Sequence, residues 1–207
     1  MDDSPDHIIL GCNELNRAIE WTLLQTGVRA AFGGVHPGLG THNALLALGP
    51  RCYLELIAPD PGQSALRWFK SLPRHSEPRL IGWAARSNDI AALSKRLDGA
   101  GVAHEAPRAA SRTRRDGGTL SWKSLPLSDD RQGLLPFFIQ WDAKSIHPAE
   151  DAPAGCSLDR FEIVTPDQEE LLRTLQLLRM KVAVAFGAAP GLRARIIGKN
   201  GPIELTS

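Results

Sequence analysis

Two polar side chains in the first third of the chain have types that bind metals or transfer protons. His7 opens the apolar stretch His-Ile-Ile-Leu-Gly, and an imidazole can ligate a metal or act as a general base. Glu55 stands between Leu54 and Leu56, where a buried carboxylate needs a metal, a cation or a hydrogen-bonded ligand. The alternative is that His7 is structural and that strand alternation points Glu55 to solvent. We expect both residues to face one cleft as metal ligands, with Glu55 also catalytic.

A glycine-rich segment at residues 33–43, Gly-Gly-Val-His-Pro-Gly-Leu-Gly-Thr-His-Asn, supplies further polar side chains. Its glycines and proline predict a tight turn whose backbone can approach a ligand closely. We assign His36, His42 and Asn43 to ligand binding, and His42 also to catalysis. The alternative is a polar hairpin in which the histidines are structural. The lysine and the hydroxyl residue of a P-loop are missing, so this is not a nucleotide-binding loop of that type.

Candidates in the second half of the chain are fewer. Gln140 lies between large apolar residues in Phe-Phe-Ile-Gln-Trp, and its carbonyl oxygen can bind a ligand or, weakly, a hard metal. Trp122 is assigned to stacking on a ligand, and a place in the hydrophobic core is the alternative for it, as for Trp83 and Trp141. The sequence contains no Gly-x-Ser-x-Gly elbow and no dinucleotide fingerprint after a strand.

Composition limits the classes of partner. With 24 basic and 23 acidic residues the net charge is +1, so no strong field directs the chain to nucleic acid or to a membrane surface. No apolar run reaches the ~18 residues that a membrane span needs, and the acidic start has no signal-peptide core behind it. Cys12, Cys52 and Cys156 are odd in number and far apart, which favours a reducing compartment. We therefore expect a cytoplasmic protein that binds neither nucleic acid nor a membrane.

A βαβββ order of elements recurs along the chain and must position these residues. We predict modules at 1–62, 80–146 and 157–207, the third partial or complete. The first has strands at 7–13, 29–32, 41–48 and 51–58, the second at 80–86, 103–106, 119–125 and 136–141, and the third at 158–164, 182–186, 192–197 and 202–206. In each module a helix follows the first strand, starting near Asn13, Asn88 and Thr165. The arginines at 108, 112, 114 and 115 are expected to surround a solvated hairpin turn.

Several segments resemble the glyoxalase-like branch of the vicinal oxygen chelate superfamily. They are Asp6-His7 at a strand start, Gly-Val-His-Pro-Gly-Leu-Gly-Thr-His-Asn at 34–43, Tyr-Leu-Glu-Leu-Ile-Ala-Pro-Asp at 53–60, and Pro-Phe-Phe-Ile-Gln-Trp at 136–141. The resemblance implies an α+β fold of repeated βαβββ modules whose paired, curved mixed sheets enclose a cleft. The pairing also follows from burial, because one such sheet cannot cover both of its faces alone.

The resemblance further implies a divalent metal held by one ligand from the first strand and one from the last strand of each paired module. His7 and Glu55 then form the first pair, and the corresponding places in the second module are Gly82 and Gln140. Because glycine cannot ligate, three alternatives stay open: a two-ligand site, a three-ligand site that recruits His36 or His42, and no metal at all.

Two functions are compatible with these residues. One is a metal-assisted lyase, isomerase or dioxygenase that acts on a small oxygenated substrate and stabilises an enolate or a related anion. The other is a non-catalytic protein that binds or sequesters a small molecule, as resistance proteins do. The expected partner is a small molecule in both cases. A homodimer is left open, since the third module has no second copy with which to pair inside the chain.

Overall fold

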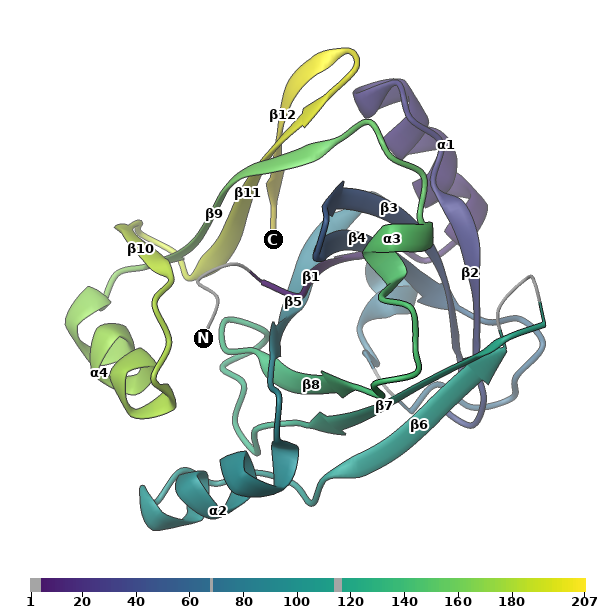
Figure 1. Cartoon of the computed structure of the whole chain (residues 1–207). Helices are drawn as coiled ribbons and strands as arrows, with labels where there is room; N and C mark the ends of the chain where they lie inside the picture. Colours follow the sequence, from purple (N-terminus) through teal and green to yellow (C-terminus); the bar gives the residue numbers. More distant parts are fainter. Residues whose placement is uncertain (1–4, 68, 114–116) are drawn as a thin grey trace.

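The computed structural model describes residues 5–67, 69–113 and 117–207 (Figure 1). Within these ranges the elements are β1 (His7–Gly11), α1 (Leu15–Thr26), β2 (Ala31–His36), β3 (Thr41–Gly49), β4 (Cys52–Pro59), a 3-10 turn (Leu72–Arg74), β5 (Arg79–Arg86), α2 (Ile90–Gly99), β6 (Arg108–Thr113), β7 (Thr119–Leu125), β8 (Phe137–Trp141), α3 (Pro148–Asp151), β9 (Ser157–Thr165), α4 (Gln168–Leu178), β10 (Ala183–Phe186), β11 (Gly191–Gly198) and β12 (Gly201–Thr206). None of the described helices has the length and apolar composition needed to cross a membrane.

The first two modules share one eight-stranded sheet with the order β2-β3-β4-β1-β5-β8-β7-β6. β1 runs parallel to β4 and antiparallel to β5, so these central strands join the two modules. The sheet curls until its edges meet, and Arg112 on β6 donates a hydrogen bond to the carbonyl of Gly33 on β2. The predicted α+β fold with paired, curved mixed sheets is therefore confirmed.

The two faces of this curved sheet bury different side chains. Along β1, Ile8 and Leu10 enter the main hydrophobic core with α1 and α2, whereas His7 and Ile9 point to the inner side. α1 has a buried stripe and ends at Gly27, whose φ of 73° lies in the left-handed region that glycine tolerates. α3 lies across the opening of the curved sheet (Figure 1). Strand alternation thus places His7 on the inner side of the sheet.

One predicted strand is misplaced. Residues 103–106 form no strand, apart from a bridge between His104 and Leu127. The strand β6 instead covers residues 108–113 and pairs antiparallel with β7. Arg108 and Arg112 lie on the first strand of the β6–β7 hairpin, in agreement with the hairpin expected at this place, while Arg114 and Arg115 lie outside the described residues.

The third module repeats the order of elements but not the order of strands. Its sheet has the order β10-β9-β11-β12, so its first strand, β9, lies between β10 and β11. In the first module the order is β2-β3-β4-β1, so the first strand, β1, stands at the end of the module's strand order. This sheet packs on the outer side of the eight-stranded sheet, where the ring of Phe161 lies 5.1 Å from that of Trp83. Trp83 is 2% exposed and donates its indole N–H to the carbonyl of Leu134 at 2.9 Å. Trp83 is therefore a core residue.

Two helices begin one residue later than predicted. The N-cap of α1 is Glu14, not Asn13, and makes no side-chain capping bond. The N-cap of α2 is Asp89, not Asn88, and its carboxylate accepts the backbone N–H of Ala92. Helix α2 begins after Asp89 because the carboxylate of Asp89 accepts a backbone N–H of the first helical turn, which otherwise has no partner within the helix.

Candidate functional site

His7 and Glu55 meet on the inner side of the curved sheet. They lie on the parallel neighbours β1 and β4, where Ile9 is the register partner of Glu55. His7 Nε2 and Glu55 Oε2 are 3.5 Å apart. Both side chains are buried, with Glu55 5% exposed, so Glu55 does not point to solvent. The structure brings this predicted pair together.

The second oxygen of Glu55 contacts the hairpin of β2 and β3. Asn43 donates its side-chain N–H to Glu55 Oε1 at 2.6 Å, and His36 Nε2 lies 3.7 Å from the same oxygen. His36 Nδ1 is bonded to the hydroxyl of Thr41 at 2.8 Å, and its Nε2 is 3.1 Å from the Asn43 amide nitrogen. A neutral imidazole that donates through Nδ1 and accepts at Nε2 satisfies both contacts. Burial lowers the pKa of His36 and outweighs the opposing charge of Glu55.

His42 is not part of this cluster. It pairs with Val35 across the hairpin, whereas His36 pairs with Thr41. Alternation along β3 points Thr41 and Asn43 inward and His42 to the opposite face, where its ring meets Phe32 edge-on at 6.3 Å. His42 is half-buried, and burial lowers its pKa against the opposing charge of Asp60.

Asp6 binds Nδ1 of His7, the ring nitrogen that does not face Glu55. This carboxylate is completely buried and accepts His7 Nδ1 at 2.9 Å. It also accepts Arg86 Nε at 3.0 Å, Trp141 Nε1 at 3.1 Å and His147 Nε2 at 3.2 Å. Burial alone would raise the pKa of Asp6, but the hydrogen bonds from His147 and His7 hold it well below its usual range. The bond to Nδ1 turns Nε2 of His7 toward Glu55.

Aromatic rings enclose the imidazole of His7. Tyr53 stacks on it with a centroid distance of 4.5 Å, and Phe137 meets it edge-on at 5.6 Å. Burial raises the pKa of Tyr53 well above its usual value, so the phenol stays protonated. Two connections close the inner side. Gln63 hydrogen-bonds the carbonyl of His36 at 3.2 Å, and Ala149 of α3 packs on Tyr53.

The second module supplies no counterpart of His7 and Glu55. Ala84 is the register partner of Phe137, as Ile9 is of Glu55, so Phe137 occupies the place that corresponds to Glu55. Gln140 lies three residues further on, and its Oε1 accepts the backbone N–H of Ile90 at the start of α2 at 2.8 Å. The structure therefore does not bring Gln140 to the cluster.

This donor set does not fit a four-ligand metal centre. The side chains at Gly82 and Phe137 have no donor atom, so these two positions of the second module contribute no side-chain ligand to a cation. Among the residues that the structure describes, no group of three His, Cys, Asp or Glu side chains is arranged to hold a metal ion.

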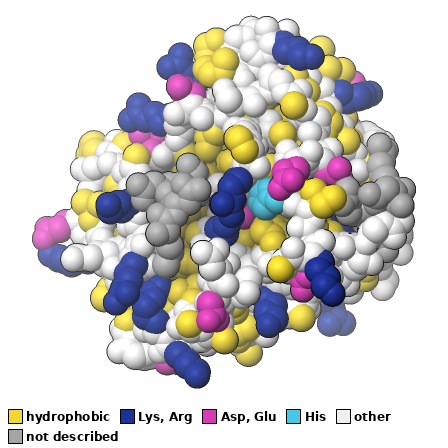
Figure 2. All heavy atoms as spheres, viewed as in Figure 1, with side chains coloured by type: hydrophobic (Ala, Val, Ile, Leu, Met, Phe, Trp, Pro, Cys, Tyr) yellow, Lys and Arg dark blue, Asp and Glu magenta, His cyan; other side chains and the backbone are white. Residues whose placement is uncertain are grey.

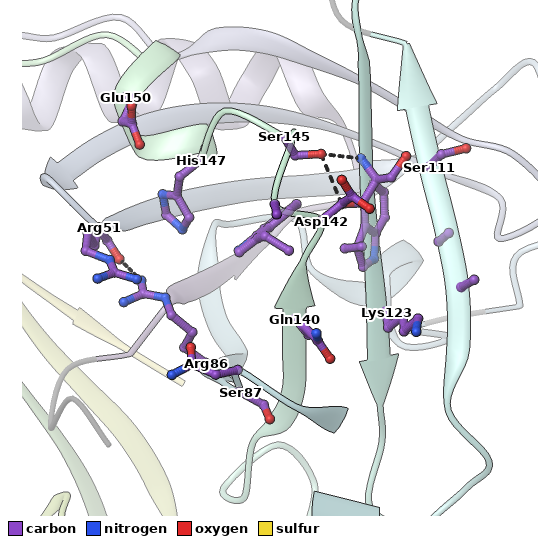
Figure 3. A pocket seen from close by; sticks show the side chains of 17 residues that line it. Arg51, Arg86, Ser87, Ser111, Lys123, Gln140, Asp142, Ser145, His147 and Glu150 are labelled. Atoms are coloured by element: carbon purple, nitrogen blue, oxygen red, sulfur yellow. Dashed lines mark hydrogen bonds between the residues drawn. The ribbon is translucent and has the colours of Figure 1, made fainter. Parts of the chain in front are cut away.

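A pocket of about 970 Å³ opens beside the partners of Asp6 (Figure 3). Its lining includes Arg51, Arg86, Lys123, Trp122, Trp141 and His147. Trp122 and Trp141 are register partners on β7 and β8, and their ring centroids are 5.7 Å apart. The pocket does not reach Glu55, because Tyr53 and His147 lie between, with ring centroids 5.8 Å apart. On the face in Figure 2, basic and acidic side chains are interspersed around a histidine that is visible at the surface.

The sequence singled out His7, Glu55, His36 and Asn43, which the structure brings together, but it did not show that Asp6, Tyr53 and His147 surround them. The available signal for Asp6 was its position directly before His7, since a carboxylate commonly orients an imidazole. His147 gave no local signal, because it lies in a connection between modules and its partner Asp6 is 141 residues away.

Comparisons with known proteins give the same fold. A family model described as a glyoxalase-like domain matches residues 6–178. A hypothetical protein from Staphylococcus aureus is 18% identical, with a TM-score of 0.68, and covers 98% of this chain and 84% of its own. A variant of methylmalonyl-CoA epimerase from Streptomyces coelicolor, in complex with 2-nitronate-propionyl-CoA, is 21% identical, with a TM-score of 0.50. The alignment covers 69% of this chain and 97% of the epimerase chain. A hypothetical protein from Bacillus halodurans is 15% identical, with a TM-score of 0.50, 70% of this chain covered and 98% of its own. No curated protein matches the chain.

Proposed function

The chain belongs to the glyoxalase-like domain family, and from that premise we propose that it catalyses proton transfer at a carbon next to a carbonyl group of a small molecule, as an isomerase does. The observation that carries the proposal is the environment of Glu55. Its carboxylate is buried on the inner side of the paired modules, with one oxygen bonded to Asn43 and the other facing His7. A buried carboxylate beside a histidine is a suitable general base. The similar fold of an epimerase agrees with this reaction class.

Each residue of the cluster has a separate role in the proposed reaction. Asn43 holds Oε1 of Glu55, which leaves Oε2 to accept the proton from the substrate carbon. The carbon–hydrogen bond breaks, its electron pair stays on the substrate as an enolate, and the new O–H bond forms on Glu55. Asp6 orients His7 so that Nε2 faces the same oxygen and can exchange the proton with it. Return of the proton to either face of the carbon completes the isomerisation.

The test is exchange of the substrate α-proton for deuterium in D2O, followed by proton NMR on a panel of 2-oxo acids, 2-hydroxy ketones and acyl-CoA thioesters. Wild-type protein is expected to exchange the proton of at least one compound. Glu55→Gln should slow that exchange by about 100-fold or more, since general base catalysis contributes that much. The matched control is Glu204→Gln, because Glu204 is an exposed glutamate on β12. Exchange that survives in Glu55→Gln would refute the proposal.

A second function is favoured by one observation. The tryptophan-containing pocket does not touch Glu55, and Glu55 is almost inaccessible. A protein that binds a small molecule without reacting needs no path from the pocket to a base. In that case a compound that binds by calorimetry would keep its α-protons in D2O, and Glu55→Gln would leave its affinity unchanged.

A further inference from the structure

The pocket beside the Asp6 cluster combines cationic and aromatic side chains. We propose that it binds a planar organic anion, an aromatic or conjugated carboxylate, with its ring against Trp122 and Trp141 and its carboxylate at Arg51 and Arg86. This ligand class goes beyond the proposed function and does not depend on it, because the pocket does not reach Glu55. The class itself follows from the side chains of the pocket.

The charges of the pocket favour an anion. Arg51 and Arg86 lie at one side and Lys123 lies toward the other (Figure 3). Within the described residues, the side chains of Arg51 and Lys123 form no hydrogen bond or ion pair with the protein, so both cations are available to a ligand. The acidic lining residues are Asp142 and Glu150, and one oxygen of Asp142 already accepts the backbone N–H of Lys144. An arginine that binds a carboxylate through two N–H groups gives a strong, oriented contact.

The aromatic side chains favour a flat ligand. The rings of Trp122 and Trp141 are tilted by 55° and neither is fully buried, so their surfaces offer a platform at the pocket. The indole N–H of Trp141 is bonded to Asp6, which fixes the orientation of that ring. Aromatic pairs in offset or edge contact are more favourable than the burial of the same area against aliphatic groups.

Hydrogen bonds within the protein orient one wall of the pocket before a ligand binds. Arg86, Trp141 and His147 are all bonded to the buried carboxylate of Asp6. Arg86 also donates to the backbone carbonyl of Arg51, so its guanidinium is held at two points. Side chains that are already ordered lose little entropy on binding. The volume of about 970 Å³ is within the range of small-molecule sites.

Isothermal titration calorimetry with three probes tests the ligand class. The probes are 2-naphthoate, 2-naphthamide, which keeps the ring but has no charge, and cyclohexanecarboxylate, which keeps the charge but is not planar. We expect 2-naphthoate to bind about tenfold tighter than either of the others, with an affinity that falls as salt is added. Equal affinities for the carboxylate and the amide would overturn the proposal.

Variants locate the binding. Arg51→Ala and Trp122→Leu should each weaken 2-naphthoate binding by about tenfold. The matched control is Arg173→Ala, an exposed arginine on α4 outside the pocket, which should have no effect. Melting curves verify that each variant is folded. Unchanged affinity in folded Arg51→Ala would refute the assignment of the anion to this pocket.

Glu55→Gln separates this inference from the proposed function. Because Glu55 does not line the pocket, the variant should bind 2-naphthoate as the wild type does. If Glu55-dependent proton exchange is found but 2-naphthoate does not bind, the ligand class is wrong and the function stands. If 2-naphthoate binds as expected but no compound exchanges its proton, the pocket assignment stands and the isomerase proposal fails.

Discussion

Asp6 Oδ2 lies 3.2 Å from Nε2 of His147, although the two residues are 141 positions apart. The contact ties the first strand of the chain to the connection that follows the second module. The other oxygen of the same carboxylate holds His7, which faces Glu55. The carboxylate of Asp6 therefore orients both His7 beside Glu55 and the pocket wall that contains Arg86, Trp141 and His147.

Replacing Asp6 with asparagine should destabilise the protein. The change removes a buried charge that faces Arg86 and places a donor group against the N–H groups of Trp141 and His147. Breaking a buried ion pair on one side typically costs about 3–5 kcal/mol in free energy of unfolding. Urea denaturation gives that value, and Asp159→Asn on the exposed part of β9 serves as control with a loss below about 1 kcal/mol. Equal losses in the two variants would contradict the role of Asp6.

Acidification should destabilise the fold through His36. Its pKa is lowered in the folded protein, so the unfolded state takes up the proton first. The contribution of neutral His36 to the free energy of unfolding is fully present above pH 6.5, the ordinary pKa of histidine. It declines as the pH falls from 6.5 toward the lowered pKa of His36 in the folded protein. The groups that act on this imidazole are Glu55, Arg112, His42 and His7. Unfolding midpoints between pH 7 and pH 5 should show the decline, and His36→Gln should reduce it. A pH dependence that is identical in the variant would show that other groups are responsible.

His42→Ala should leave ligand binding and proton exchange unchanged. The side chain lies on the opposite face of β3 from Asn43 and contacts Phe32. Its loss removes an edge contact between the half-buried ring of His42 and the exposed ring of Phe32, which is worth about 1 kcal/mol or less in free energy of unfolding. Asn43→Ala is the paired variant, and it should impair exchange because Asn43 bonds Glu55 directly. A catalytic defect in His42→Ala would restore the role that the sequence predicts for this histidine.

Metal binding by the wild-type protein should be weak, because His7 and Glu55 are the only ligands of the predicted four that the described strands offer at the cluster. The double variant Gly82→His, Phe137→Glu would add a ligand pair from the second module. A Cβ on Gly82 would meet only Phe69 at 3.8 Å among the described residues, an ordinary contact. Calorimetry with Zn²⁺ on chelator-treated protein should show an increase in affinity of about 100-fold or more. Tight, stoichiometric binding by the wild type would refute this account.

The pair His7 and Glu55 could be predicted because each is a polar residue inside an apolar strand. Two adjacent parallel strands then place both side chains on one face. The same physics explains why Gln140 does not reach the Glu55 cluster. Its segment resembles that of Glu55, but the strand register aligns Phe137 with Glu55, and an offset of three residues turns a side chain to the other face.

The sequence did not reveal β6 or the strand order of the third sheet. The residues of β6, Arg-Ala-Ala-Ser-Arg-Thr, lack the apolar alternation of a buried strand, because an edge strand of this kind is held by its pairing with β7. The third module repeats the pattern of elements, but the pattern does not specify which strands become neighbours. Glu204, whose segment Ile-Glu-Leu is similar to the Leu-Glu-Leu around Glu55, lies exposed on β12.

The convergence on Asp6 has a consequence for how this chain can change. Four side chains, those of His7, Arg86, Trp141 and His147, share one acceptor, so substitutions among these positions cannot have independent effects. Once Asp6 is lost, a further loss of His147 should cost much less than it does alone. In mutational libraries these positions should show strong epistasis, and in divergent sequences they should be exchanged together as a set.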